Sequence, residues 1–137
     1  MSHDLITDCH IHIQPMEMLK PEAFELIKSK STDFDRIMEF CRSPKAFLKY
    51  LDASGVGRAV LINYVAPEVM GLTSEVNQWV ANYAGTDPGR LLSCGGLHPR
   101  HSPNVMADVE QILRLKIRMI KIHHRISYCF LTTICME

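Results

Sequence analysis

The sequence predicts an α/β fold built from about four βα units. Short apolar segments alternate four times with segments of helical periodicity, and such alternation is typical of parallel strands joined by helices. One of the apolar segments, 59–65, is nearly continuous, which favours a strand buried on both faces, as in parallel sheets. The length of 137 residues suits one domain with its own core.

The composition narrows the classes of partner. Lys plus Arg number 15 and Asp plus Glu number 15, so no net field draws the chain to nucleic acid or to an anionic membrane. No segment approaches the ~20 apolar residues of a membrane span, and the first residues do not resemble a secretion signal. We expect a globular protein that acts on a small molecule.

The cysteines indicate the compartment. They are odd in number and contain no CxxC pair, which argues against a disulfide framework. We therefore expect a reducing, cytoplasmic environment. The positions are Cys9, Cys41, Cys94, Cys129 and Cys135, of which the last two have no nearby base or ligand spacing that would support reactivity.

The first strand carries the most informative motif. Asp8-Cys9-His10-Ile11-His12 follows a short apolar run that starts at Leu5. Residues two apart on a strand share a face about 6.6 Å from each other, so Asp8, His10 and His12 are predicted to point the same way. Two imidazoles placed like this can bind one metal ion, although a catalytic zinc site takes three protein ligands.

A long loop is predicted next. Pro15 and Pro21 interrupt the chain, and the polar stretch from Lys28 to Asp35 shows little periodicity. We expect this stretch to cover the mouth of the site. Ser43-Pro44 then starts a helix that runs from Pro44 to Ser54, where Gly55 supplies a left-handed stop.

The remaining elements repeat the strand and helix pattern. Thr73 is the expected cap of a second helix that ends at Gly85, with Trp79 and Tyr83 on its core side. Leu91–Leu97 is the third predicted strand. Ser102-Pro103 predicts the start of a third helix, and 117–122 a fourth strand.

A barrel explains the position of the motif better than an open doubly wound sheet. The first βα turn lacks the glycine-rich phosphate fingerprint of dinucleotide-binding sheets. In a TIM (β/α)8 barrel the active site lies at the carboxyl ends of the strands, where His10 and His12 stand. The predicted fold is therefore the N-terminal half of such a barrel, truncated after about four βα units.

Four segments at the expected strand ends carry a family resemblance. They are Asp8-Cys9-His10-Ile11-His12-Ile13-Gln14-Pro15, Leu61-Ile62-Asn63-Tyr64, Gly95-Gly96-Leu97-His98-Pro99-Arg100 and Ile120-Lys121-Ile122-His123. The first motif resembles the amidohydrolase superfamily of metal-dependent barrels, and the four together resemble its amidohydrolase-related branch, which includes aminocarboxymuconate-semialdehyde decarboxylase; the resemblance covers Leu5 to about His123. It implies a divalent metal, usually Zn²⁺, held by His10 and His12 with a histidine from strand five and an aspartate from strand eight, while a strand-six histidine handles protons.

Other polar residues at strand ends are candidates for the site. Asp8 either orients an imidazole or is a strand-end turn residue. His98 and Arg100 either contact substrate, with the arginine fork holding a carboxylate, or are held by ordinary loop hydrogen bonds. Asn63 and Tyr64 either reach the site or form local hydrogen bonds.

The fourth strand contributes two further candidates. Lys121 and His123 share a face of it. Lys121 is expected to pack or to pair with a charge; the alternative is a carbamate that bridges two metals, as in some amidohydrolases. His123 is a candidate pocket residue.

The function we expect is metal-dependent hydrolysis of a small molecule, by attack of an activated water on a lactone, amide or similar bond. Non-oxidative decarboxylation of a small unsaturated or aromatic acid is the alternative. The third reading is a catalytically incompetent fragment, because the expected catalytic residues belong to strands beyond the fourth. A half-barrel has unpaired edge strands that can pair with a second copy of the chain, so a homo-oligomer is kept as an alternative to a monomer.

The last residues depart from the family pattern. Residues 1–124 form the predicted partial barrel domain, and 125–137 form a tail without family resemblance. We interpret the tail as the result of a frameshift near His124 or of a truncated gene. Sequencing the downstream DNA in all frames tests this, and no barrel-like second half in any frame would contradict it.

Overall fold

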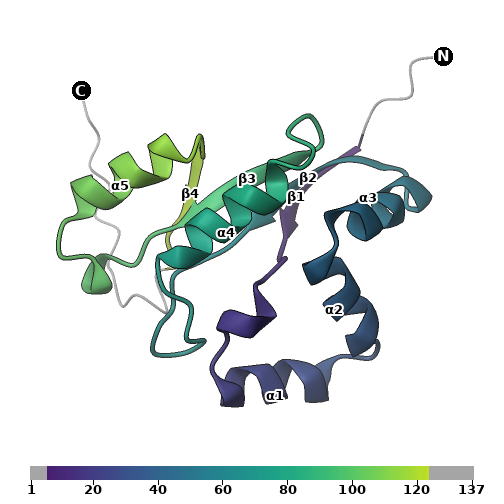
Figure 1. Ribbon diagram of the computed structural model, residues 1–137, viewed down its shortest axis with the longest axis horizontal. Coiled ribbons are helices and arrows are strands. Elements are labelled where there is room, and N and C mark those ends of the chain that lie inside the picture. The colour runs from purple at the N-terminus through teal and green to yellow at the C-terminus, as the bar shows by residue number, and fades with distance from the viewer. Residues whose placement is uncertain (1–5, 124–137) are drawn as a thin grey trace.

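A computed structural model describes residues 6–123, which contain one parallel sheet of four strands (Figure 1). The strands are β1 (Ile6–Ile11), β2 (Val56–Ile62), β3 (Leu91–Gly96) and β4 (Met119–Lys121). They lie in the sheet in chain order, each parallel to its neighbour. The predicted α/β half-barrel is confirmed, and all four carboxyl ends lie at one edge.

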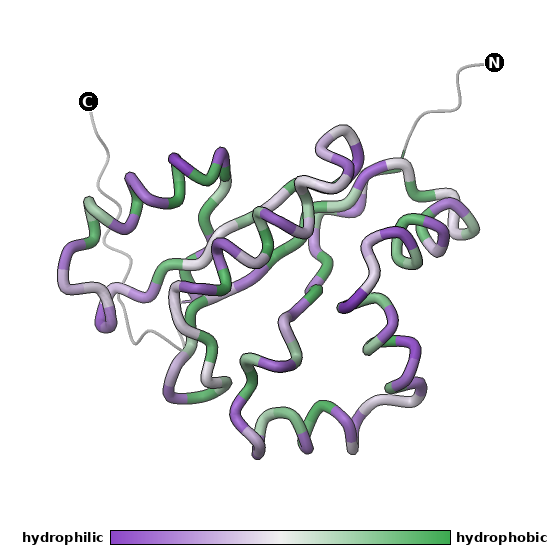
Figure 2. The backbone as a smooth tube through the Cα atoms, viewed as in Figure 1, coloured by the Kyte–Doolittle hydropathy of each residue, from purple (hydrophilic) through white to green (hydrophobic). Residues whose placement is uncertain are grey.

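Helices connect these strands, as the periodicity predicts. They are α3 (Pro44–Ala53) before β2, α4 (Glu75–Ala84) before β3 and α5 (Val105–Arg114) before β4. In Figure 1, α4 crosses the sheet over β2 and β3. Hydrophobic and hydrophilic residues alternate along α5 in Figure 2, as expected for a helix with one face on the core.

The prediction of a long loop over 15–35 is wrong. This region contains a 3₁₀ turn η1 (Met16–Met18), helix α1 (Pro21–Lys30) and the start of helix α2 (Phe34–Arg42). Pro21 occupies the first position of α1, where a missing N–H costs nothing. Asp33 caps α2 by accepting a hydrogen bond from the backbone N–H of Arg36 (3.2 Å).

These two helices close a small core of their own. The buried side chains come from the segment before α1, from α2 and from the end of β2 through the start of α4. Partly buried residues of α1 and α2 cover them, which gives the polar-looking stretch its apolar face. The buried members are Met16, Leu19, Cys41, Val65, Leu72 and Val76, and the covering residues include Phe24, Ile27, Ile37 and Met38.

The predicted ends of α3 are confirmed. The Ser43 side chain accepts from the backbone N–H of Ala46 (3.2 Å), and Gly55 has φ +70°. Helix α4 ends at Ala84, next to the predicted Gly85. Unlike Gly55, Gly85 has an ordinary negative φ of −62°, so it is not a left-handed stop.

The other two predicted caps are displaced by one or more residues. The residue that precedes α4 is Ser74, and Thr73 Oγ1 instead accepts from the N–H of Glu75 (3.4 Å). The cap of α5 is Asn104, which accepts from the N–H of Ala107 (3.1 Å). Helix α5 therefore starts later than the expected Ser102-Pro103, and a short 3₁₀ turn η2 (Pro99–His101) lies earlier in the same loop.

The main core lies between the sheet and its helices. Ala59 and Leu61 of β2 face it, whereas Val60 and Ile62 pack with Cys94 on the other face. This confirms that β2 is apolar on both faces. The predicted packing of the α4 stripe is also confirmed, because Tyr83 is buried and Trp79 packs against the same cluster.

Several expectations lie outside the described residues. These are the tail at 125–137 with its frameshift interpretation, the domain boundary at 124, and Cys129 and Cys135. Within residues 6–123 no helix is long and apolar enough to cross a membrane.

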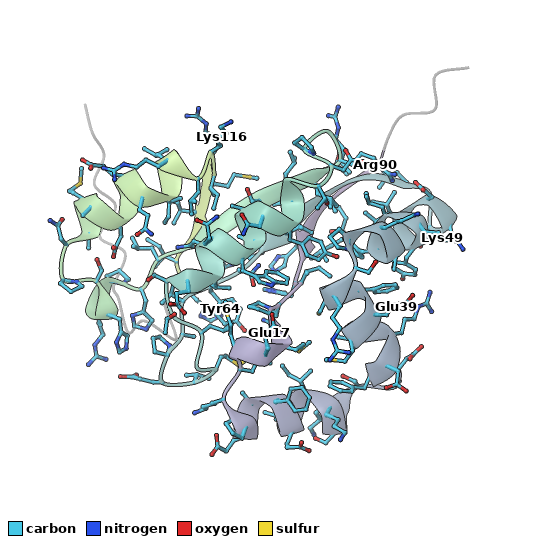
Figure 3. The ribbon with its side chains drawn as sticks, viewed as in Figure 1. Glu17, Glu39, Lys49, Tyr64, Arg90 and Lys116 are labelled. Carbon is cyan, nitrogen blue, oxygen red and sulfur yellow. The ribbon has the colours of Figure 1, made fainter. Side chains whose placement is uncertain are left out.

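Arg90, labelled in Figure 3, ties three elements together at the amino end of the sheet. Its guanidinium donates to the carbonyls of Gly57 (3.0 Å) and Val56 (3.2 Å) and pairs with Asp52 of α3 (2.7 Å). Asp52 is largely exposed, so the ion pair itself contributes little. The charged donors to the two carbonyls carry most of the stabilisation.

Arg90→Ala is therefore expected to lower the free energy of unfolding by about 2 kcal/mol, measured by urea denaturation. Arg114→Ala is the matched control, because Arg114 forms an exposed pair with Glu110 on the same helix. Its effect should stay below about 0.5 kcal/mol. Equal effects of the two substitutions would contradict this assignment.

Candidate metal site

The two histidines of β1 converge. Asp8 pairs with Ala59 and Ile11 with Leu61, so the β1 register shifts against β2 between these residues. Such irregularities re-aim side chains. The Asp8 carboxylate accepts from the backbone N–H of His10 (3.0 Å), and the Nε2 atoms of His10 and His12 lie 3.1 Å apart.

The separation of these two nitrogens fits a shared metal ion. At a Zn–N distance of 2.0–2.1 Å and tetrahedral angles, two imidazole nitrogens on one zinc lie about 3.3 Å apart. Without a metal, a 3.1 Å contact is a hydrogen bond between neutral rings of complementary tautomers. The rings therefore need little movement to exchange one state for the other.

The described residues supply only this pair. Among residues 6–123, no group of three or more His, Cys, Asp or Glu side chains is placed to hold a metal. Asp8 is engaged with backbone rather than with an imidazole ring, which is the local role of a strand-end carboxylate.

Residues at or just after the carboxyl ends of β2 and β4 lie near the pair. The ring of Tyr64, labelled in Figure 3, lies 5.7 Å from the ring of His12 and 5.9 Å from that of His123. Lys121 lies close enough for its charge to act on His12. The parallel sheet thus brings together five predicted residues, which we call the histidine cluster: His10, His12, Tyr64, Lys121 and His123.

The electrostatics of the histidine cluster favour neutral imidazole at His12. Partial burial of the ring lowers its pKa below 6.5, and the nearby His10, Lys121 and His123 lower it further. A backbone hydrogen bond with Ile62 acts in the opposite direction. Neutral imidazole is the form that binds a metal.

The loop after β3 places its polar residues elsewhere. The ring of His98 is buried and lies 4.4 Å from that of His101, whose Nε2 is 3.4 Å from a carboxylate oxygen of Glu68. A hollow of about 260 Å³ includes His98 and His101 in its wall but no member of the histidine cluster. Arg100 is exposed on the same loop.

Asn63 does not face an open site. Its side chain is fully buried, and neither amide atom has a hydrogen-bond partner among residues 6–123. Its backbone N–H donates to the carbonyl of Cys94 (3.4 Å), so its clearest role is in the pairing of β2 with β3.

One buried polar residue of this region was missed by sequence reasoning. Asn77 of α4 accepts from the N–H of Gly96 (2.7 Å) and donates to its carbonyl (3.0 Å). The available signal was an amide beside Val76 and near Val80 on the apolar stripe of the helix.

Comparison with known proteins supports the fold. No protein-family model matches the sequence, and no match is found among curated proteins. A solved structure, an uncharacterised TIM-barrel protein from Bordetella bronchiseptica, is similar with a TM-score of 0.61 at 19% sequence identity. The similarity covers 85% of this chain and 43% of that one, so the chain spans less than half of that barrel protein.

The pKa of His12 provides a test of the cluster. We expect it below 6.5 in the native chain, and closer to 6.5 in His10→Gln, because that substitution removes a neighbouring positive charge. The measurement is the ring proton shift by NMR across pH. His101→Gln, on the other loop, is the control and should leave the titration of His12 unchanged.

The same shift makes His12 a source of acid sensitivity. Because its folded pKa is lowered, the unfolded chain takes up the proton first, so this contribution to stability is lost as pH falls below about 6.5. Urea denaturation should show a smaller decrease over this range for His12→Gln. A native pKa above 6.5 would contradict both expectations.

Proposed function

We propose that the chain forms part of a metal-dependent enzyme of the amidohydrolase-related family that hydrolyses a small molecule. The observation that carries the proposal is the 3.1 Å separation of the His10 and His12 Nε2 atoms at the carboxyl edge of a parallel half-barrel sheet. Active sites of (β/α)8 barrels lie at this edge.

The donor set favours zinc among divalent ions, since the two donors that residues 6–123 bring together are imidazole nitrogens, which suit Zn²⁺. When bound, such an ion polarises a carbonyl and provides a hydroxide nucleophile near neutral pH. The remaining ligands, which the family resemblance assigns to strands five and eight, are part of the proposal. Within the described residues, His10 and His12 would hold the ion.

The other members of the histidine cluster would act on the substrate. Tyr64 forms an aromatic wall beside His12, which can exclude water from one side of the metal. Lys121 places a positive charge near His12 and can attract a substrate carboxylate. Substrate contacts by His98 or Arg100 would come from the loop between β3 and α5.

Decarboxylation is the second candidate, and Lys121 is the observation that favours it. A decarboxylase needs a carboxylate substrate held beside its metal, and a cation near His12 suits that need. The free thiols of Cys9, Cys41 and Cys94 support a reducing, cytoplasmic compartment for either reaction.

Zinc binding tests the metal site. The native chain is expected to bind Zn²⁺ through the histidine pair, and His10→Ala or His12→Ala should weaken the affinity roughly tenfold or more. Calorimetric titration of the purified chain measures this. His101→Ala removes a histidine outside the cluster and serves as the matched control, with unchanged affinity.

Turnover tests the reaction class. The zinc-loaded chain is assayed on panels of lactones and of unsaturated carboxylic acids, following water-oxygen incorporation and CO₂ release. Incorporation at a carbonyl supports hydrolysis, and CO₂ release supports decarboxylation. Zinc binding without turnover would favour the catalytically incompetent alternative, and absence of zinc binding would contradict the metal site.

A further inference from the structure

The amide of Asn77 holds the carboxyl end of β3 by both of its backbone groups. Asn77 lies on the buried side of α4, and the two hydrogen bonds with Gly96, of 2.7 and 3.0 Å, satisfy both ends of its amide. A side chain paired in this way has a defined orientation, because the carboxamide can accept from an N–H and donate to a carbonyl in only one rotation.

Gly96 in turn touches the backbone that carries Tyr64. A Cβ added at Gly96 would lie 2.6 Å from the Tyr64 Cα and 2.6 Å from the Val65 nitrogen, closer than real Cβ atoms approach. This contact therefore requires glycine, and a displacement of the Gly96 backbone would also displace the backbone of Tyr64.

Tyr64 passes this constraint to the histidines. Its ring contacts that of His12 on one side and that of His123 on the other. A connected series of contacts thus runs from α4 through the end of β3 and the end of β2 to the histidine pair. Asn77 is buried at one end of it and belongs to no part of the proposed chemistry.

We propose that Asn77 is a positioning residue of the histidine cluster: by holding Gly96 it fixes the backbone at Tyr64, and so the ring that abuts His12 and His123. Its effect on metal binding rests on the proposed function, whereas its effect on the Tyr64 ring does not. Supporting partners of metal ligands commonly change affinity when removed, by roughly 10- to 100-fold.

The first test is structural and uses the metal-free chain. NMR should show ring-to-ring NOEs from Tyr64 to His12 and to His123 in the native chain, and these should weaken in Asn77→Ala, which removes both hydrogen bonds. Gln78→Ala is the matched control on the same helix, because Gln78 is exposed and its amide donates to Asn82 (2.8 Å). Its NOEs should match those of the native chain.

The second test separates positioning from a general loss of stability. Zinc affinity is measured for Asn77→Ala, Tyr64→Ala and the double variant. If Asn77 acts through Tyr64, Asn77→Ala should lower the affinity roughly tenfold in the native background and have little effect when Tyr64 is absent. Additive losses, or NOEs unchanged in folded Asn77→Ala, would overturn the proposal.

Two further variants keep the proposal testable if Asn77→Ala does not fold. Asn77→Asp retains an acceptor for the Gly96 N–H but places a carboxylate oxygen against the Gly96 carbonyl, so the Tyr64 NOEs should also weaken. Gly96→Ala should displace Tyr64 directly and weaken the same NOEs, and unchanged NOEs in both variants would overturn the proposal. A native chain that binds no zinc would remove the proposed function, while the NOEs would still decide the role of Asn77.

Discussion

The parallel pairing of β1 with β2 is the constraint on which the rest of the structure depends. It places the end of β1 beside the end of β2, so that the rings of His12 and Tyr64, far apart in sequence, come into contact. Pairing of β2 with β3 and of β3 with β4 extends the same edge to His123. Antiparallel pairing of any neighbour would have sent these groups to opposite edges.

Apolar pattern and local capping made much of this arrangement predictable. The four strands were recognisable because β-branched and apolar runs stand between helical periods, and Ser43 and Gly55 mark α3 through local chemistry. Helices α1 and α2 were missed although apolar residues recur at helical spacing in α2, as at Phe34, Ile37 and Cys41, because the two prolines and the polar stretch before α2 are equally typical of a loop. Pro21 is equally compatible with a loop and with a helix start, and only the fold distinguishes them.

The candidate site shows the same division between local and tertiary information. Strand alternation sufficed to place His10 and His12 on a common face, but the 3.1 Å approach of their nitrogens depends on the shifted register of β1 against β2. The hollow that His98 lines contains no member of the cluster in its wall, and its shape depends on the path of the β3–α5 loop through η2. Asn77 could not be assigned from its spacing, because its partner is a backbone group 19 positions along the chain.

If the proposed metal site is correct, charge is one reason for this pair of rings to take up one metal ion rather than two protons. Protonating both imidazoles would place two positive charges about 3 Å apart, in a partly desolvated position that Lys121 already makes unfavourable for a further cation. Neutral rings can share one hydrogen bond, which leaves only one nitrogen lone pair engaged. A divalent ion engages both lone pairs at almost the same nitrogen separation, so little reorganisation opposes its binding. The ring of Tyr64 lies against that of His12, and the backbone of Tyr64 is closely packed against Gly96, so under the proposed function the geometry that disfavours two protons would favour one metal ion.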